Sequence, residues 1–380
     1  MTKKKKILKI RDLDISFKTD NGEVKAVRGV DLDLHEGETI AIVGESGSGK
    51  SVTTKAVMGI LASNGVINKG SIEFTYTDLS KERIAEVTQK YDGVIPEGYA
   101  KEEEIKTVDI TQQSKKFIQS EIRGRRIAMV FQDPMTSLDP TMTIGKQVME
   151  AMLFHYKIPK KEAYARAVQL LELVGITDAE KRMKNYPHQL SGGMRQRIVI
   201  AIALSCDPEI LICDEPTTAL DVTIQAKILE LIKDIQKKKN LSVIYITHDL
   251  GVVAKVADFV NVMYAGRIIE KGSVNEIFYG PRHPYTWGLL ASLPDVDTAG
   301  DELYTIPGTP PNLLKEIKGD AFAPRNPFAL KIDEKIAPPM FEITPTHHVA
   351  SWLAAPNAPK VEMPQDLKAR IEKNRKEANW

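Results

Sequence analysis

The sequence predicts an α/β fold built on a mainly parallel sheet. Residues 39–61 run from an apolar β-branched strand through a glycine-rich loop into a helical pattern of apolar residues. Continuous apolar runs at 209–213 and 241–246 each end in charged or polar residues, as strands buried on both faces of a parallel sheet do. Before them, residues 7–34 alternate between apolar and polar, which favours an antiparallel lobe. We also expect a small helical subdomain and a loop-rich C-terminal extension.

Composition limits the classes of protein to which this chain can belong. Its 52 Lys and Arg against 51 Asp and Glu give a net charge of +1, and so no overall basic field for nucleic acid. Cys206 and Cys213 are the only cysteines, which fits a reducing compartment and argues against a disulfide framework or a cysteine-ligated zinc site. No run approaches the ~18 apolar residues of a membrane-spanning helix, and no apolar signal segment follows Met1–Lys6. We expect a cytosolic chain that does not itself cross a membrane.

Two alternating segments, 7–17 and 24–34, are predicted to form a hairpin with Asp20–Gly22 as its turn. Phe17 stands just before that turn. Its ring could stack on a purine base, or it could be an aromatic residue at the edge of the lobe's core, and the sequence leaves both interpretations open.

The segment Gly44–Ser51 fits the pattern G-x-x-x-x-G-K-[ST] of a phosphate-binding P-loop. Its glycines allow backbone N–H groups to turn toward phosphate oxygens, and the following helix adds its positive dipole. Lys50 is expected to reach the β- and γ-phosphates of a nucleotide, and the Ser51 hydroxyl to ligate Mg²⁺. A plain glycine turn is the alternative, but the flanking strand and helix favour nucleotide binding. The predicted contacts are Gly44, Glu45, Ser46, Gly47, Ser48, Gly49, Lys50, Ser51 and Val52.

Strand character resumes at 65–74, and residues 75–121 then turn polar with weak periodicity, which indicates an insertion. Within it, the charge run 101–104 is most simply a solvated surface. A strand at 126–131 ends in Gln132, whose amide oxygen could reach a metal or a water near a phosphate. Residues 145–174 follow with helical periodicity and predict the helical subdomain.

A second anion site is predicted where Ser191, Gly192 and Gly193 precede an apolar helix at 198–205. Unpaired N–H groups and the helix dipole both favour negative charge at such a position. A glycine C-cap is the alternative, but here the serine and glycines come before the helix rather than after it.

Two strand ends carry the predicted catalytic groups. Asp214 and Glu215 follow the buried run 209–213; Asp214 is expected to orient Mg²⁺ through water, and Glu215 to polarise the attacking water. His248 follows the run 241–246 and would lie at the same sheet edge. A pair of surface acids and a structural histidine are the alternatives.

These motifs, in this order, resemble those of the nucleotide-binding subunit of an ABC transporter over residues 7–275. The implied fold is a P-loop NTPase ABC cassette, with a RecA-like core, an antiparallel β lobe and a helical subdomain. Met194 departs from most of the superfamily, which has glutamine there, and its Met-Arg-Gln-Arg form is similar to the peptide and nickel importer branch. The matching motifs are Walker A at Lys50 and Ser51, the Q-loop at Gln132, the signature at Leu190–Met194, Walker B at Asp214 and Glu215, the D-loop at Ala219–Asp221 and the switch histidine at His248.

The C-terminal third resembles the extension of oligopeptide and dipeptide import ATPases, in the segments 280–286, 306–311 and 348–352. The P-loop form Gly-Ser-Gly-Lys-Ser-Val-Thr is similar to the D-type subunit, the first of that system's two ATPases. The expected division is an ABC nucleotide-binding domain at 1–279, with a polar insertion at 75–121 and a helical subdomain at 135–190, then the extension at 280–355 and a charged tail at 356–380.

In much of that family the extension carries four cysteines for an iron–sulfur cluster, but at the corresponding positions this chain has Asp320, Asn326, Asp333 and Ser351. Such a cluster needs thiolate ligands, so we expect no iron–sulfur cluster. A hard-metal site at Asp320 and Asp333 is the competing interpretation. We expect apolar burial to hold the extension together instead, with these candidates: Phe322, Phe328, Met340, Phe341, Val349, Trp352 and Leu353.

The resemblance implies an ATPase that powers import of oligopeptides or dipeptides, with ATP and Mg²⁺ as cofactors. Ser51, Gln132 and Asp214 would hold the metal, and Glu215 and His248 would be catalytic. In the family, ATP is sandwiched in a head-to-tail dimer, so Ser191–Gly193 and Asp221 would face the nucleotide of the other subunit. The implied partners are a second, related ATPase, two multi-spanning membrane subunits and an extracellular peptide-binding protein, at the cytoplasmic face of the cell membrane.

Three alternatives remain at this point. A nickel or other small-solute importer of the same branch is the nearest. A soluble ABC protein acting on nucleic acid or ribosomes would normally show fused cassettes, a coiled-coil arm or a basic stripe, none of which we find. A non-hydrolysing ATP-binding scaffold is opposed by Glu215 and His248.

Overall fold

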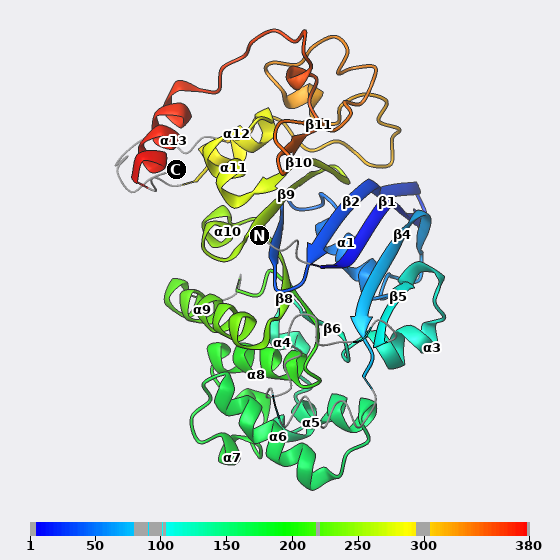
Figure 1. The fold of residues 1–380 in the computed structure, drawn as a ribbon, viewed down its shortest axis with the longest axis vertical. Helices are drawn as coiled ribbons and strands as arrows, with labels where there is room; N and C mark the ends of the chain where they lie inside the picture. The colour runs from blue at the N-terminus through cyan, green and yellow to red at the C-terminus, as the bar shows by residue number, and fades with distance from the viewer. Residues whose placement is uncertain are drawn as a thin grey trace.

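A computed structural model describes residues 5–79, 90, 101, 104–217, 221–293 and 305–377. Figure 1 shows a central sheet with a β lobe on one side, a helical region below it and the C-terminal extension above it. The α/β fold predicted from the sequence is therefore confirmed.

The central sheet has eight strands in the order β11-β12-β10-β9-β3-β8-β7-β6. The five from β9 to β6 are parallel, while β10, β12 and β11 continue the sheet in antiparallel pairs. The strands are β3 Thr39–Val43, β6 Ile127–Val130, β7 Ile210–Asp214, β8 Ser242–Thr247, β9 Phe259–Tyr264, β10 Arg267–Ser273, β11 Phe341–Glu342 and β12 His348–Val349.

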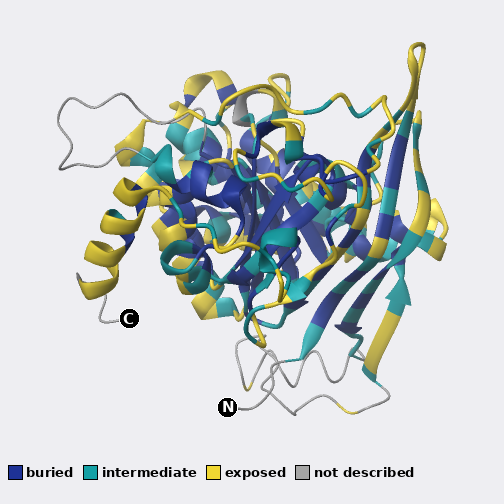
Figure 2. Ribbon diagram, turned by 90° about the horizontal axis from the view of Figure 1, so that it is seen from above, coloured by how far each residue is buried: buried dark blue, intermediate teal, exposed yellow. Residues whose placement is uncertain are grey.

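Every residue of β3, β6, β7 and β8 is buried, as their continuous apolar runs predict. Alternate side chains point to opposite faces of the sheet. In β8, Ile244 and Ile246 pack into the apolar cluster beneath the β lobe, whereas Val243 and Tyr245 pack into the cluster beneath the helices. Figure 2 shows this buried sheet at the centre of the molecule.

The β lobe is a four-stranded antiparallel sheet in the order β2-β1-β4-β5. Its strands are β1 Lys6–Thr19, β2 Gly22–His35, β4 Gly65–Thr77 and β5 Ile105–Asp109. The predicted hairpin is confirmed, because β1 pairs with β2 up to Thr19 and Gly22. The register shifts between Ile10 and Leu13, where Asp12 takes a positive φ of 46°. This bulge keeps both Ile10 and Leu13 buried despite their odd spacing.

The described part of the expected insertion, 75–121, contributes to the β lobe. Strand β5 pairs antiparallel with β4, and the short helices α3 (Lys115–Phe117) and η3 (Ile118–Ile122) follow it. Ile118 and Ile122 are buried in the lobe's cluster. Most of 80–103, including part of the charge run 101–104, lies outside the described residues.

Helix α1 (Lys50–Val57) packs with α3 and η3 into the apolar cluster on the lobe side of the sheet, whereas most later helices pack into the other cluster. The predicted helical subdomain contains α5 and α6, which are separated by a short segment ending at Pro159, the N-cap of α6. The helices in and after this region are α4 Pro134–Ser137, α5 Ile144–His155, α6 Lys160–Leu173, α7 Ala179–Arg182, α8 Gly192–Leu204, α9 Val222–Lys239 and α10 Leu250–Val256.

The C-terminal part begins with α11 (Val274–Tyr279) and α12 (Pro284–Ala291) and ends with α13 (Gln365–Glu377). Between them, the short helices η5 (Ala323–Arg325) and η6 (Trp352–Ala354) interrupt a loop-rich segment, as expected. The residues expected as a charged tail include α13, whose Leu367 and Ile371 are buried against the main apolar cluster. Among the described residues, no helix is long and apolar enough to cross a membrane.

Apolar burial in the extension agrees with most of the expected residues but not all. Phe322 and Val349 are buried, with 2% and 0% of their surface exposed. Met340 was expected in this core, and that prediction is wrong: its side chain is 39% exposed, because the chain around it runs along the surface. The remaining candidates are half-buried; they are Phe328, Phe341, Trp352 and Leu353.

Candidate functional site

The P-loop joins β3 to α1 and depends on glycine at two points of close contact. Gly44 has a φ of 148°, and a Cβ placed on it would lie 2.0 Å from the carbonyl oxygen of Met263. Gly49 has a φ of 103°, and its Cβ would lie 2.5 Å from the carbonyl oxygen of Ala26. At Gly47 no described heavy atom beyond its chain neighbours lies within 4 Å of such a Cβ. The loop therefore lies against β9 at one end and against β2 of the lobe at the other, and is open at its middle, where a phosphate can approach.

Lys50 is folded back over the loop that precedes it. Its Nζ donates to the carbonyl oxygens of Gly44 at 2.7 Å and Glu45 at 2.9 Å. The residue is 5% exposed, and burial lowers the pKa of its ammonium, while the carboxylates of Glu215 and Asp214 oppose that shift. The side chain is thus fixed at the loop with a third donor that these two bonds do not use.

Ser51 and Asp214 meet across the edge of the sheet. The Ser51 hydroxyl donates to Oδ1 of Asp214 at 2.9 Å. Burial raises the pKa of Asp214, and the hydrogen bond from Ser51 partly opposes this. A hydroxyl and a carboxylate at the end of a P-loop are the hard oxygen donors that suit Mg²⁺, so these residues fit the metal that the motif implies.

Glu215 directly follows β7 and is held from two neighbouring strands. Its backbone takes a φ of 46°, and its N–H donates to the carbonyl oxygen of Ile246 in β8 at 2.9 Å. The Nε2 of Gln132, after β6, donates to Oε2 of Glu215 at 2.9 Å. The Nδ1 of His248, after β8, lies 3.0 Å from Oε1. The structure therefore brings together Glu215 and His248, which the sequence predicted to share an edge, and it adds Gln132 beside them.

The residues of the predicted second anion site lie at the start of α8, and anion binding there stays a prediction. Ser191 is the N-cap residue, and its Oγ accepts a hydrogen bond from the N–H of Met194 at 3.3 Å. Asp221 caps α9 in the same way through Ile224. A Cβ on Gly193 would lie 3.0 Å from Ile224, so these two helix starts are neighbours. Within the described part of the chain, no hydrogen bond links them to the P-loop, and Ala219 and Leu220 lie outside it.

Phe17 is half-buried at the end of β1, opposite Val24 of β2 and Gly65 of β4. A Cβ on Gly65 would lie 2.8 Å from its ring, so the ring packs closely on the β4 backbone. This contact supports the interpretation of Phe17 as an aromatic residue at the edge of the lobe, and stacking on a purine remains a prediction.

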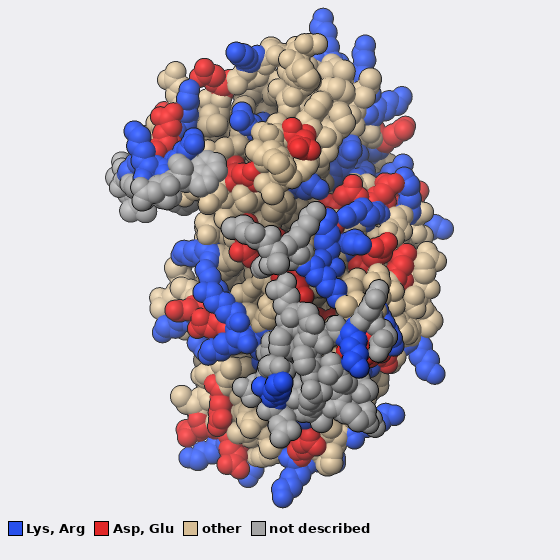
Figure 3. Space-filling model, in the orientation of Figure 1, with Lys and Arg blue, Asp and Glu red and all other residues tan. Residues whose placement is uncertain are grey.

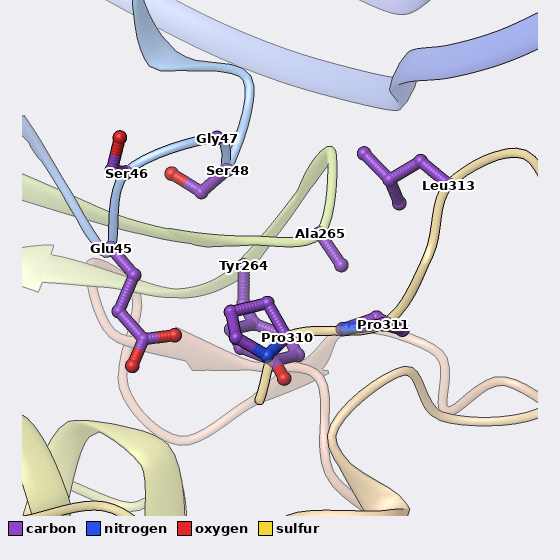
Figure 4. Close-up of a pocket in the computed structure, with 9 residues that line it drawn as sticks. All are labelled: Glu45, Ser46, Gly47, Ser48, Tyr264, Ala265, Pro310, Pro311 and Leu313. Carbon is purple, nitrogen blue, oxygen red and sulfur yellow. The ribbon is translucent and has the colours of Figure 1, made fainter. Parts of the chain in front are cut away.

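The structure adds residues to the site that the sequence did not indicate. The carboxylate of Glu45 forms two hydrogen bonds with the guanidinium of Arg325, at 2.7 and 2.9 Å. The N–H of Glu45 donates to the Tyr285 hydroxyl at 2.9 Å. Figure 4 shows Glu45 pointing away from Ser46, with Pro310 of the extension beside Tyr264. Tyr285 lies in a segment that the sequence linked to the extension. The contact between Arg325 and Glu45 spans 280 residues, so it leaves no local pattern in the sequence.

The fold and this phosphate-binding edge define an ATP-binding cassette ATPase. Comparison with known families agrees, because the ABC transporter family matches residues 27–117 and 97–218. The chain belongs to the oligopeptide and dipeptide transport ATP-binding branch of that family. The C-terminal region of oligopeptide/dipeptide transporters matches residues 269–332, which confirms the resemblance noted for the extension.

Curated relatives resemble the chain over almost its whole length. It is 54% identical to the oligopeptide transport ATP-binding protein OppD of Bacillus subtilis (strain 168), over 97% of this chain and 94% of that protein. It is 53% identical to the dipeptide transport ATP-binding protein DppD of Lactococcus lactis subsp. cremoris (strain MG1363), over 96% of each chain.

Solved structures resemble the cassette part. The MJ0796 cassette, solved as a dimer bound to ADP and Pi, matches with a TM-score of 0.55 and 23% identity, over 70% of this chain and 98% of that one. The cbiO1 protein of Clostridium perfringens, part of the ABC transporter complex cbiONQ, matches with a TM-score of 0.54 and 29% identity, over 73% of this chain and 92% of that one. The first of these supports the fold alone.

The residues present do not fit the iron–sulfur cluster found in much of this family. The four aligned positions are buried, and one side-chain oxygen of each residue accepts a hydrogen bond from a nearby backbone N–H. The pairs are Asp320 with Phe322 at 3.0 Å, Asn326 with Phe328 at 3.0 Å, Asp333 with Leu330 at 2.6 Å and Ser351 with Leu353 at 3.3 Å. These four residues therefore stabilise local turns of the chain, at the positions where the cluster would need thiolate ligands.

The two cysteines are not placed to supply thiolates to that region. Both are buried in the apolar core, and burial raises the pKa of Cys206 to about 11 and raises the pKa of Cys213 as well. The competing hard-metal site gains no support, because no group of three or more His, Cys, Asp or Glu in the described residues could hold a metal ion.

Proposed function

We propose that this chain is the ATP-hydrolysing subunit that powers import of oligopeptides or dipeptides through a membrane ABC transporter. The observation that carries this proposal is the pair of family matches, one to the cassette and one to the peptide-transporter C-terminal region. Relatives at 54% and 53% identity over nearly the whole chain are named as oligopeptide and dipeptide transport ATP-binding proteins.

The geometry supports a division of labour at the site. Lys50 and the P-loop amides bind the β- and γ-phosphates of ATP, while Ser51, Asp214 and Gln132 would hold Mg²⁺, which neutralises charge on the phosphates when bound. Glu215 is oriented by Gln132 and His248, so its carboxylate can polarise an attacking water and accept a proton from it. Positioning of the attacking water and electrostatic stabilisation of the transition state then supply most of the rate enhancement.

The signature residues act on a second nucleotide in this proposal. Ser191–Gly193 and Asp221 lie at neighbouring helix starts and have no hydrogen bond to the P-loop within the described residues. They would face the P-loop of a partner cassette in a head-to-tail dimer, where a helix N-terminus can bind the γ-phosphate. We propose a second, related ATPase as that partner, which forms a heterodimer with this chain.

The proposed complex includes two multi-spanning membrane subunits and an extracellular peptide-binding protein. This chain would lie at the cytoplasmic face of the cell membrane as a peripheral subunit. We propose that the Gln132 loop and the helical subdomain pass dimer closure to the membrane subunits, since Gln132 bonds to the catalytic Glu215 and begins the connection to that subdomain.

The alternative functions find less support. A nickel or other small-solute importer of the same branch is less supported, because the curated relatives reported above are named for oligopeptide and dipeptide transport. A protein acting on nucleic acid would present a continuous basic surface. Figure 3 shows Lys and Arg interspersed with Asp and Glu among the described residues on the visible face.

The proposal is tested by reconstituting the chain with its membrane subunits, partner ATPase and binding protein in proteoliposomes. ATP-dependent uptake of a labelled tetrapeptide or dipeptide is expected, and uptake of ⁶³Ni²⁺ is not. Nickel uptake without peptide uptake would overturn the substrate assignment.

A further inference from the structure

Arg325, at the end of η5 in the extension, has every one of its donors paired. A guanidinium carries five N–H groups in a fixed plane. The residue is 7% exposed, so its charge depends on these partners rather than on water. The acceptors are Pro307 O for Nε at 2.8 Å, Glu45 Oε2 and Tyr264 OH for Nη1 at 2.7 and 3.2 Å, and Glu45 Oε1 and Ile306 O for Nη2 at 2.9 and 3.3 Å.

Glu45 is held at each of its polar groups. Arg325 of the extension donates to its carboxylate. The hydroxyl of Tyr285 in α12 accepts a hydrogen bond from its backbone N–H. Its carbonyl oxygen accepts a hydrogen bond from Nζ of Lys50 at 2.9 Å. One residue of the P-loop therefore joins the C-terminal extension to the lysine that binds phosphate.

The surroundings make this connection rigid. The rings of Tyr264, Tyr285 and Phe322 form a buried cluster with centroid separations of 4.7, 5.3 and 5.3 Å. Pro310 and Pro311 line a pocket together with the P-loop residues 45–48 and Tyr264 (Figure 4). An arginine in such a packed, bidentate site cannot be replaced by lysine without loss of geometry.

We propose that Arg325 is a positioning residue of the nucleotide site, through which the docked extension sets the affinity of the P-loop for ATP. Arg325 neutralises Glu45 and fixes its backbone, so that the Lys50 ammonium stays directed at the phosphates. Without Arg325, the unpaired Glu45 carboxylate would attract the Lys50 ammonium, on which its charge already acts, and would compete with the phosphates for it. This proposal concerns nucleotide binding, so it does not depend on which solute the transporter imports.

The coupling must act in both directions. If the docked extension strengthens nucleotide binding, nucleotide binding must strengthen docking of the extension by the same factor. We therefore expect ATP to slow amide hydrogen exchange in residues 305–330 of the full-length chain, as well as in the P-loop.

A double-mutant cycle on the full-length chain tests the proposal. The variants are Arg325→Met, Glu45→Gln and the double variant, and the measured quantity is the dissociation constant of a fluorescent ATP analogue with Mg²⁺. Arg325→Met is expected to weaken binding about tenfold, the scale of coupling between contacting charged residues, when Glu45 is present. In the Glu45→Gln background the same change is expected to have little effect, because no carboxylate remains to be neutralised.

Arg370→Met is the matched control. Arg370 also anchors the C-terminal region, by donating to the carbonyl oxygens of Leu290 and Leu293, and among the described residues it forms no hydrogen bond or ion pair with the P-loop. Its removal is expected to leave nucleotide affinity unchanged. Equal affinity of Arg325→Met and wild type, or an equal loss in both Glu45 backgrounds, would overturn the proposal.

Arg325→Lys keeps the result interpretable if Arg325→Met does not fold. It retains the charge and much of the stem, so it is expected to fold and to give an affinity between those of wild type and Arg325→Met. Wild-type affinity in this variant, together with ATP-independent exchange of 305–330, would also refute the coupling. None of these readouts depends on peptide transport, so they stand or fall apart from the proposed function.

Discussion

The Nδ1 atom of His248 lies 3.0 Å from Oε1 of Glu215, although 33 residues separate the two along the chain. They meet because β7 and β8 are parallel neighbours, with Asp214 paired to Ile246 at the end of the ladder. The left-handed backbone of Glu215, with φ of 46°, directs its carboxylate toward this edge.

We predict that Glu215→Gln keeps ATP binding and loses turnover. The amide preserves the shape of the side chain but cannot accept a proton from the attacking water. Steady-state hydrolysis in the assembled complex should therefore fall by about 10²- to 10⁴-fold. Glu230→Gln makes the same chemical change on the exposed face of α9 and serves as the control. Wild-type ATPase activity in Glu215→Gln would show that another group activates the water.

Lys50→Ala should instead weaken nucleotide binding. It removes the cation that the loop carbonyls of Gly44 and Glu45 hold in place, and a charge-assisted bond to phosphate is among the strongest contacts of such a site. Titration with ATP and Mg²⁺ measures the loss, and Lys160→Ala on the exposed start of α6 serves as control. An unchanged affinity would contradict the assigned role of Lys50.

We predict that the working unit pairs this chain with a second, related cassette rather than with a copy of itself. The reason is that the P-loop form resembles the D-type subunit of a two-ATPase system. Native mass spectrometry of the purified transporter measures its composition. Two copies of this chain without another cassette would refute the prediction.

Asp333→Asn should stabilise the chain at neutral pH. Burial, and the nearby charge of Asp320, raise the pKa of Asp333 above its ordinary value. A raised carboxyl pKa contributes stability that is present below the unfolded-state pKa and is lost as pH rises through the folded-state pKa. Asparagine keeps the acceptor for the N–H of Leu330 without that loss.

The melting temperature of Asp333→Asn relative to wild type should therefore rise as pH rises from about 4 toward 8. Asp366→Asn, at an exposed position of α13, is the matched control and should show no such trend. A constant difference across this pH range would mean that Asp333 does not titrate between folded and unfolded states as expected.

Phe322→Ala should destabilise the extension strongly, by about 3–5 kcal/mol, the usual cost of truncating a buried phenylalanine. Phe322 packs between Tyr264 and Tyr285 and is 2% exposed. Met340→Ala offers the comparison, since Met340 is exposed and its truncation should change stability by about 0.5 kcal/mol or less. Thermal unfolding of both variants measures the difference. Equal effects would mean that the aromatic cluster does not hold the extension.

Local patterns were enough to predict the parts of the site that follow directly from strands. The P-loop spacing and the acids after a four-residue apolar run are short-range signals, and each placed its residue on the correct edge. Strand β5 was missed because a polar strand at the rim of a sheet resembles a loop in composition. Helix α13 was missed because Leu367 and Ile371 are its only large apolar residues among many charged and polar ones. Arg325 could not be predicted, because nothing near it in sequence distinguishes its partner.

The pairing of β10 with β12 has a consequence for how this protein could be divided or recombined. Glu270 pairs with Val349, Lys271 pairs with His348, and the N–H of Ala350 donates to Ile269 at 2.7 Å. A chain cut after residue 279 would leave β10 as an open edge, with free donors and acceptors that invite another molecule to add a strand. Such a fragment should self-associate, and an extension grafted from a distant relative would have to bring a strand in the same register.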